Sequence, residues 1–387
     1  MDLYTALVYL GGAVALTQAL SFLSILYKTL IRPGKNLKKC GEWAVVTGAT
    51  DGIGKAMAFE LARKGSSVFL LSRTESKLAA VKAEIEEKYP KVGVKTLAVD
   101  FSNFTAPQAA TVKAALDGLE VGVLVNNVGI SYEFAQWFHE LTDSEVEGLI
   151  SLNVESTTWM TRAVLPGMLA RRAGCVVNMS SAAARAPLPL LAQYSASKGY
   201  IENFTRSLAA EYASKGVSFQ VQSPLWVATA MTFPGSKTPP EKRATITTPT
   251  AKTYARYAVA RIGYDVMASP YWAHEVYVWL QERLPNALKI MVILDMHKKV
   301  RLALTRPRTH VCKRPRSPPH PHPQRAPGAL PQEEHGQDGR EVGQEGPVKP
   351  RRCCAPGRAV STRRVAGQGV GMRNDEWRRR RTITFLV

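Results

Sequence analysis

Cysteine is scarce in this chain of 387 residues, which contains only five. They form no Cys-x-x-Cys pair, and no Cys/His pattern has the spacing of zinc ligands. Nor is there a disulfide framework, which agrees with a reducing compartment. His320 and His322 lie close together in the sequence, but two histidines without further ligands do not make a metal site. We therefore predict no metal centre.

Charge is absent near the start, since no residue between Asp2 and Lys28 is charged. A helix needs about 20 apolar residues to cross a bilayer, and this stretch supplies enough. It is too long for a signal-peptide core and has no basic region before it. We predict a membrane anchor over residues 1–31; a hairpin or interfacial anchor is the alternative. Under the positive-inside rule, the basic residues that follow keep the C-terminal side in the cytosol. They are Lys28, Arg32, Lys35, Lys38 and Lys39.

Apolar periodicity is absent from residues 301–387, which are rich in Pro, Arg, Gly and Gln. More than half of the net charge of +20 lies in this stretch. Such a composition cannot bury enough apolar surface to offset the entropy of ordering the chain. We predict a disordered basic tail, or an aberrant C-terminus. Basic tails can bind anionic lipid or nucleic acid, but no specific nucleic-acid partner is expected.

Glycines recur at a spacing typical of dinucleotide sites after an apolar strand predicted at 43–47. Gly48, Gly52 and Gly54 follow it in the spacing GxxxGxG, and an amphipathic helix comes next. Glycine is needed where backbone approaches a pyrophosphate closely, and the helix N-terminus then offers free N–H groups. Alone the motif is also compatible with a structural turn. The strand before it and the helix after it favour a dinucleotide site.

The second predicted strand, SVFLLSR, ends without the Asp or Glu that usually binds the ribose hydroxyls of NAD. Arg73 stands there instead, after Ser72. A guanidinium pairs with a 2′-phosphate, whereas a carboxylate repels it. The position therefore favours NADPH as the cofactor; the alternative is a surface charge at a strand end.

Two further strands end in polar residues. VKTLAVD ends at Asp100, placed to accept a hydrogen bond from an adenine amino group, and VGVLVNNVG contains Asn126, placed to line the adenosine ribose. Helical patterns alternate with these strands. The alternation predicts an α/β fold, a Rossmann-like doubly wound parallel sheet, over a catalytic domain at residues 40–300.

The stretch QYSASKG places Tyr194 and Lys198 one helical turn apart on the same face of a helix. A nearby ammonium stabilises a phenolate, so we expect Lys198 to lower the pKa of Tyr194. Ser181, at the end of the strand GCVVNMSS, can hold a carbonyl oxygen while Tyr194 protonates it. Asn153 is a further candidate, orienting a water that connects Lys198 to solvent. By itself the Tyr–Lys spacing also occurs by chance.

TGATDGIG, NNVG, Ser181, Tyr194 and Lys198 stand in the order and spacing of the short-chain dehydrogenase/reductase family, which the chain resembles from about residue 40 to 230. GISYEFAQWFHE, PLWVATAM and IGYDVMASPYWAH narrow the resemblance to the branch of very-long-chain 3-oxoacyl-CoA reductases, which also contains 17β-hydroxysteroid dehydrogenases.

The resemblance implies reduction of a 3-oxoacyl-CoA by NADPH in fatty-acid elongation at the endoplasmic reticulum membrane. Expected partners are a long-chain acyl-CoA, membrane lipid and other elongase subunits. It also implies catalytic roles for Asn153, Ser181, Tyr194 and Lys198. The cofactor positions, besides Tyr194 and Lys198, are Gly48, Gly52, Ile53, Gly54, Arg73, Asp100, Asn126 and Thr229.

Other functions stay open on the sequence. A 17-ketosteroid is an alternative substrate, and a catalytically silent membrane scaffold is an alternative of another class. We expect a mobile lid at about 229–251, a stretch rich in Pro, Thr and Lys. The apolar stretch at about 270–294 is either a second membrane-contacting element or the last core helix plus a strand.

Overall fold

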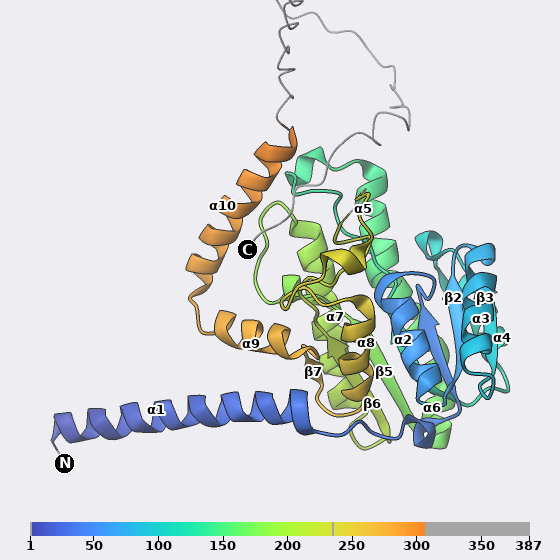
Figure 1. Cartoon of the computed structure of the whole chain (residues 1–387), viewed down its shortest axis with the longest axis horizontal. Coiled ribbons are helices and arrows are strands. Elements are labelled where there is room, and N and C mark those ends of the chain that lie inside the picture. Colours follow the sequence, from blue (N-terminus) through green and yellow to red (C-terminus); the bar gives the residue numbers. More distant parts are fainter. Residues whose placement is uncertain (1, 234–235, 306–387) are drawn as a thin grey trace, which may run out of the picture. The chain divides into compact units, whose positions relative to one another are not determined.

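The computed structural model of the chain describes residues 2–233 and 236–305 (Figure 1). The predicted basic tail lies outside the described residues from residue 306 onward. Helix α10, the last element within the described residues, runs from Asn286 to Thr305 and so passes the domain boundary expected at residue 300.

A parallel sheet forms the centre of the catalytic domain. Within the described residues it has seven strands in the order β3-β2-β1-β4-β5-β6-β7, all of them paired in parallel. The order reverses direction between β1 and β4, so the predicted Rossmann-like, doubly wound sheet is confirmed. The strands are β1 Trp43–Thr47, β2 Ser67–Ser72, β3 Val94–Ala98, β4 Val121–Asn126, β5 Gly174–Met179, β6 Val217–Gln222 and β7 Met267–Ala268.

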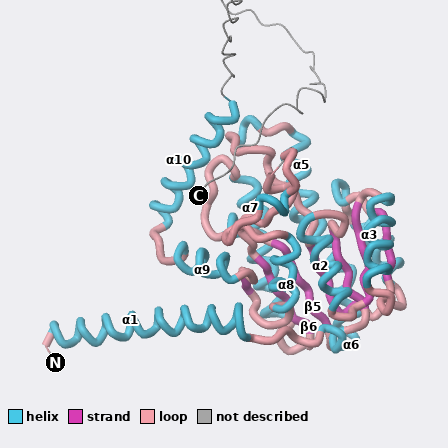
Figure 2. The backbone as a smooth tube through the Cα atoms, in the orientation of Figure 1, coloured by secondary structure: helices cyan, strands magenta, loops and turns pink. Residues whose placement is uncertain are grey.

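Helices cover both faces of the sheet (Figure 2). Side chains of α2, α3 and α8 pack on one face, and those of α4, α6 and α7 on the other. The bounds are α2 Gly52–Arg63, α3 Glu75–Lys88, α4 Ala106–Leu116, α5 Asp143–Ile150, α6 Ser156–Arg171, α7 Ala192–Glu211 and α8 Ala251–Ala260.

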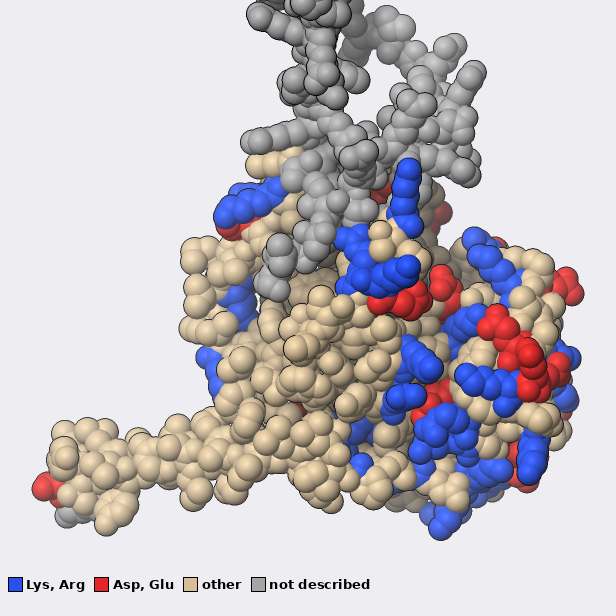
Figure 3. Space-filling view, viewed as in Figure 1, with Lys and Arg blue, Asp and Glu red and all other residues tan. Residues whose placement is uncertain are grey.

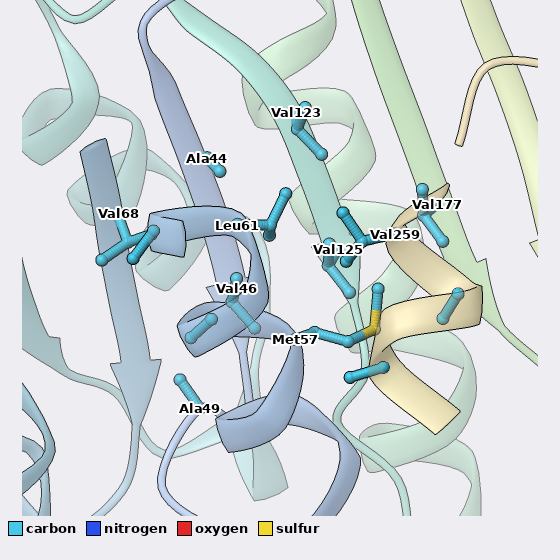
Figure 4. Close-up of a cluster of buried hydrophobic side chains, with 14 of the residues drawn as sticks. Ala44, Val46, Ala49, Met57, Leu61, Val68, Val123, Val125, Val177 and Val259 are labelled. Atoms are coloured by element: carbon cyan, nitrogen blue, oxygen red, sulfur yellow. The ribbon is translucent and has the colours of Figure 1, made fainter. Parts of the chain in front are cut away.

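Strand β1 shows why the strands read as continuous apolar runs. Ala44 and Val46 point to the face covered by α2, where Met57 and Leu61 meet them (Figure 4). Val45 lies between them in sequence and packs in the cluster on the opposite face. A strand buried on both faces needs apolar residues at every position, and this accounts for the sequence WAVVT.

The apolar N-terminus forms one continuous helical stretch: α1, Leu3–Leu26, and a π-helical turn at Tyr27–Ile31. It is long and apolar enough to cross a membrane, and no other helix in the described part of the chain is. Figure 3 shows an uncharged surface along this helix. Its second half contacts helix α9, Trp272–Gln281: the Trp279 indole donates to Ser21 Oγ over 3.0 Å, and its ring packs at a tilt against Phe22 with 5.6 Å between the ring centres.

The basic linker after α1 docks on the catalytic domain. Lys28 and Arg32 both pair with the Asp265 carboxylate, and the Arg32 guanidinium lies 4.0 Å from the centre of the Tyr264 ring. The Tyr264 hydroxyl in turn donates to the Pro33 carbonyl. These residues, which sequence reasoning assigned only to membrane orientation, therefore also attach helix α1 to the domain.

The apolar stretch at about 270–294 was expected to be either a membrane-contacting element or a last core helix plus a strand. It forms helix α9 followed by helix α10, and no strand lies between them in the described residues. Leu288 and Met291 of α10 face solvent, while His297 on the same helix is buried and its Nδ1 lies 2.7 Å from the Pro189 carbonyl. Further along, Arg301 pairs with Glu140. Helix α10 is thus held to the domain by polar contacts and exposes apolar residues.

Candidate active site

The predicted site residues gather at the carboxyl edge of the sheet. The glycine turn follows β1, Asn126 ends β4, and Ser181 comes two residues after β5. In doubly wound sheets, ligands bind at this edge where the strand order reverses, here between β1 and β4. The fold therefore brings together segments that are more than 100 residues apart in the sequence.

The three glycine positions of the turn after β1 tolerate only glycine. Gly48 and Gly52 have φ angles of +65° and +54°, which side chains other than glycine rarely adopt. A Cβ on Gly54 would lie 2.2 Å from the Gly48 carbonyl oxygen. Asn127 supports the turn, because its Nδ2 donates to the Thr47 carbonyl over 3.2 Å. That last contact joins two strands, so the sequence alone did not reveal it.

The turn opens helix α2, whose first-turn N–H groups lack acceptors within the helix. Asp51 caps this end by accepting from the Gly52 N–H. Ile53 packs partly into the core, which fixes the direction of the helix. Thr229, one of the predicted cofactor residues, lies against this turn: a Cβ on Gly52 would be 3.3 Å from its methyl carbon.

Arg73 and Asp100 both lie exposed at the ends of their strands. Asp100 Oδ1 accepts from the Ser102 N–H over 2.9 Å, and the hydrogen bonds from Ser102 hold the pKa of Asp100 below its ordinary value, with a smaller contribution from the charge of Arg73. The two charges are therefore neighbours at the edge of the sheet. Both are open to a ligand from solvent.

Asn126 has a different setting from the one expected. It is buried, and its Nδ2 donates to Asn178 Oδ1 over 2.8 Å and to Thr161 Oγ1 over 3.0 Å. These contacts bind β4 to β5 and α6 inside the domain. Its Oδ1 has no hydrogen-bond partner among the described residues. The amide group therefore organises the sheet beneath the site.

The side chains of Tyr194 and Ser181 lie close enough for the serine to influence the pKa of the phenol. Ser181 also accepts from the Ala183 N–H, which fixes its hydroxyl at the end of β5. Burial raises the pKa of Tyr194, and the hydrogen bond from Ser181 only partly opposes this effect. The expected lowering of the Tyr194 pKa is thus not what the structure shows: desolvation outweighs the neighbouring groups.

Lys198 is buried beside Tyr194, with its Nζ 5.8 Å from the centre of the tyrosine ring. The ammonium donates to the Met179 carbonyl at the end of β5 over 3.1 Å. Burial lowers the pKa of Lys198 to about 8. Ser180 Oγ donates to the Lys198 carbonyl over 2.9 Å, so the helix carrying the pair is attached directly to the strand carrying Ser181.

Asn153 lies in a π-helical turn, Ser151–Glu155, between α5 and α6. Its side chain closes a ring with Ile130, accepting from the N–H over 2.8 Å and donating to the carbonyl over 3.0 Å. It also donates to Ser197 Oγ over 2.9 Å. A Cβ on Gly129 would lie 2.8 Å from Asn153 Oδ1 and 3.2 Å from Lys198 Nζ, so both polar groups border this glycine.

A buried histidine anchors the segment expected to act as a lid. His274 Nδ1 accepts from the Leu225 N–H over 3.3 Å, and Nε2 lies 3.1 Å from the Thr247 carbonyl. Burial lowers the pKa of His274 to about 4, so the ring is neutral at pH 7. Sequence reasoning missed this residue because its partners lie 49 and 27 residues away.

The arrangement has the parts of a carbonyl reductase site. The side chains of a serine and a tyrosine lie near each other, a buried ammonium lies beside them, and a glycine turn that begins a helix lies at the same edge of the sheet. This set can polarise and protonate a carbonyl oxygen next to a dinucleotide. No group of three or more His, Cys, Asp or Glu residues in the described ranges is arranged to hold a metal ion.

Comparison with known families gives the class. The family model for short chain dehydrogenases matches residues 42–239, and the chain belongs to this family. It is an oxidoreductase that acts on a carbonyl or hydroxyl group with a nicotinamide cofactor.

The chain is similar to several curated proteins over most of their length. The human very-long-chain 3-oxoacyl-CoA reductase is 39% identical over 263 residues, which cover 67% of this chain and 81% of that protein. A very-long-chain 3-oxoacyl-CoA reductase-like protein of Arabidopsis thaliana is 41% identical over 256 residues, covering 66% and 80%. The human protein named inactive hydroxysteroid dehydrogenase-like protein 1 is 40% identical over 252 residues, covering 65% and 75%.

Among solved structures, a 7beta-hydroxysteroid dehydrogenase superposes with a TM-score of 0.59 at 24% identity, over 67% of this chain and 99% of that one. At this identity the likeness shows the fold alone.

Proposed function

We propose that the protein reduces the ketone of a 3-oxoacyl-CoA to a 3-hydroxyacyl-CoA with NADPH. The observation that carries the proposal is the contact between Ser181 and Tyr194 with Lys198 one turn further along the same helix. The substrate class is supported by relatives about 40% identical that are named very-long-chain 3-oxoacyl-CoA reductases.

In this mechanism Tyr194 donates a proton to the ketone oxygen while Ser181 donates a hydrogen bond to it. A raised pKa suits this direction, because it keeps the phenol protonated until negative charge develops on the substrate oxygen. Lys198 remains mostly protonated at pH 7 with its pKa near 8. Its positive charge then favours removal of the proton from Tyr194 in the transition state. Asn153 borders Gly129 together with the Lys198 ammonium and so fixes this side of the site.

The cofactor-facing residues fit a phosphorylated dinucleotide. The Gly48–Gly54 turn packs so tightly that a Cβ on Gly54 would lie 2.2 Å from the Gly48 carbonyl oxygen, and it lies next to a helix N-terminus that suits a pyrophosphate. Arg73 is exposed where a 2′-phosphate is expected, and Thr229 borders the turn. When bound, NADPH would supply the hydride; Arg73, the turn, Lys198 and Thr229 would hold it.

The deciding experiment measures NADPH and NADH oxidation by the membrane-embedded full chain on 3-oxoacyl-CoA substrates of increasing acyl length. We expect turnover with NADPH that increases toward long chains and a much lower rate with NADH. Androstenedione serves as the competing substrate. Turnover of the ketosteroid without turnover of any 3-oxoacyl-CoA would contradict the proposal and establish the steroid alternative.

A non-catalytic role is the second candidate, because one relative of similar identity is named inactive. This chain retains Ser181 beside Tyr194 and has the Lys198 ammonium 5.8 Å from the centre of the tyrosine ring, and a scaffold has no need of that arrangement. If no 3-oxoacyl-CoA and no ketosteroid is reduced under any condition that preserves NADPH binding, the scaffold is favoured.

We further propose that α1 anchors the protein in the endoplasmic reticulum membrane with the catalytic domain in the cytosol. The support is an uncharged helix of 24 residues followed by a basic linker that docks on the domain. Acyl-CoA, membrane lipid and elongase subunits are the proposed partners. Protease treatment of sealed microsomes tests the orientation: the catalytic domain should be digested without detergent, and full protection would contradict this topology.

A further inference from the structure

Two thiols meet at the amino edge of the sheet, away from the candidate active site. Cys40 Sγ and Cys175 Sγ lie 3.4 Å apart, although the residues are 135 positions apart in sequence. Cys40 ends a short 3-10 helix, Leu37–Cys40, that connects the anchor to β1, and Cys175 is the second residue of β5. Both are free cysteines, and no others fall within the described residues.

Glycines allow the two segments to approach each other. Gly41 has a φ of +147°, and a Cβ on it would lie 2.6 Å from the Glu120 carbonyl oxygen and 2.7 Å from the Gly122 nitrogen. A Cβ on Gly122 would likewise overlap Gly41. The 3-10 helix can therefore cross the start of β4 and bring Cys40 over the next strand. On the far side, Gly263 lies beside Cys175, since a Cβ there would be 3.6 Å from its Sγ.

The two thiols differ in burial and in charge. Cys175 is buried, and its contact with Cys40 and its burial both raise its pKa, so it stays a thiol. Cys40 is half-buried, and the hydrogen bond from Cys175 lowers its pKa to about 7, with the charge of Lys35 adding to the effect. Ser218 Oγ donates to Cys175 Sγ over 3.2 Å. One partner is therefore partly thiolate at neutral pH and the other holds a proton.

A cavity of about 410 Å³ gives small molecules access to the pair. Besides the two cysteines, its lining includes Lys35, Lys39 and Ser218. Lysine charges beside a half-buried thiolate are the setting in which protein thiols react. The ammonium of Lys35 donates to the Gly263 carbonyl, which keeps this charge next to the thiols.

We propose that Cys40 and Cys175 form a redox-active dithiol that hydrogen peroxide converts to an intramolecular disulfide. The Cys40 thiolate attacks one peroxide oxygen; the O–O bond breaks, an S–O bond forms, and hydroxide leaves and takes up a proton. The Cys175 sulfur then displaces hydroxide from Cys40, forming the S–S bond, and its proton completes the second water. Two thiols lose two electrons and one peroxide gains them. The sulfur atoms must approach to about 2.05 Å, a movement of little more than 1 Å.

The disulfide would join the anchor linker to β5 without touching the catalytic groups. Cys175 lies at the start of β5, whereas Ser181 lies beyond its end. Oxidation therefore links the segment that follows α1 covalently to the sheet. It leaves Ser181, Tyr194 and the glycine turn in place. A reducing compartment keeps the dithiol reduced until peroxide appears.

Peptide mapping of the full chain in membranes tests the bond directly. After hydrogen peroxide and alkylation of remaining thiols, trypsin releases residues 40–55 and 173–185, each with a single cysteine. We expect these two peptides joined, with the loss of two hydrogen atoms, and separated again by dithiothreitol. Mutation of Cys312, Cys353 and Cys354 to Ser provides the background that removes competing thiols. Only singly oxidised or alkylated peptides in that background would overturn the proposal.

A second measurement separates the dithiol from an isolated reactive cysteine. Cys175→Ala removes the hydrogen bond to Cys40, so the Cys40 pKa should rise toward its ordinary value. The thiolate fraction at pH 7 then falls about fiftyfold, but the more basic thiolate is the stronger nucleophile, which leaves about a five- to tenfold slower alkylation. Cys40→Ala is the matched variant and should keep wild-type reductase activity. An unchanged alkylation rate at Cys40 in Cys175→Ala would overturn the coupling.

Discussion

The cofactor half and the catalytic half of the site are built in opposite ways. Arg73 and Asp100, expected to face the nucleotide, lie exposed at strand ends with few internal contacts. Lys198 and Asn153, expected to serve the reaction, are buried and hydrogen-bonded to backbone carbonyls of other segments. Groups that recognise a ligand from solvent stay open, while groups that act on a reacting atom are held in place before the ligand arrives.

The largest effect should come from removing the proton donor. Tyr194→Phe keeps the ring but deletes the hydroxyl that contacts Ser181. General acid catalysis contributes roughly 100- to 10,000-fold, so we expect about a thousandfold lower kcat for 3-oxoacyl-CoA reduction with unchanged NADPH binding. Tyr200→Phe, on the exposed side of the same helix, is the control and should stay within about twofold of wild type. A Tyr194→Phe variant that retains most of its activity would refute the catalytic assignment.

A smaller but still large loss of activity is expected when a methyl group is added next to the buried residues Asn153 and Lys198. In Gly129→Ala the new methyl group meets Asn153 Oδ1 and Lys198 Nζ at 2.8 and 3.2 Å, so both must shift. A displacement of about 1 Å can cost about a hundredfold in rate, and we expect a decrease of that order in kcat.

Gly199→Ala is the matched control for this substitution. It adds a methyl group in the middle of α7 where no atom lies within 4 Å. Alanine is the better helix former, so this variant should keep its rate and gain about 0.5–1 kcal/mol in unfolding free energy. Equal losses of activity in the two glycine variants would show that the region around Gly129 has no special role.

Substitution of an exposed cofactor residue should change the preference between NADPH and NADH instead of the rate of reduction. Arg73→Ala removes the charge proposed to meet the 2′-phosphate, and a charge-assisted hydrogen bond contributes about 1.5–3 kcal/mol. We expect KM for NADPH to rise at least about tenfold, with KM for NADH unchanged. Lys77→Ala removes an exposed charge of the same sign nearby on α3. If both variants change the KM of NADPH equally, the effect is general electrostatics and not recognition.

The same contrast explains how far the sequence could predict the molecule. The apolar runs and the glycine turn depend on local pattern, and β1 was predicted at 43–47, where it lies. Ser181, Tyr194 and Lys198 could be predicted to lie near one another because their order and spacing carry the signal. Parallel strands align their ends at one edge, and this gives long-range proximity from local pattern.

What escaped prediction depends on contacts between distant segments. Nothing local to Asn126 distinguishes an amide that lines a ribose from one that bonds to Asn178 inside the sheet. The raised pKa of Tyr194 likewise follows from its burial by the fold, which the interaction with Ser181 opposes only in part. The meeting of Cys40 with Cys175 requires knowing that two glycines let one segment cross another.

The smallest effect concerns the segment that His274 attaches to the domain. The pKa of its ring is about 4 in the folded chain and about 6.5 when unfolded, so the unfolded state binds more protons between these values. Stability is therefore fully present above about pH 6.5 and is lost as pH falls toward 4. We expect this residue to contribute a loss of about 1 kcal/mol between about pH 7 and about pH 5.5. Urea unfolding of wild type and His274→Gln measures it: the difference in unfolding free energy between them should shrink with falling pH. A constant difference would mean that the ring does not titrate in this way, and that the contacts to Leu225 and Thr247 do not depend on its neutral form.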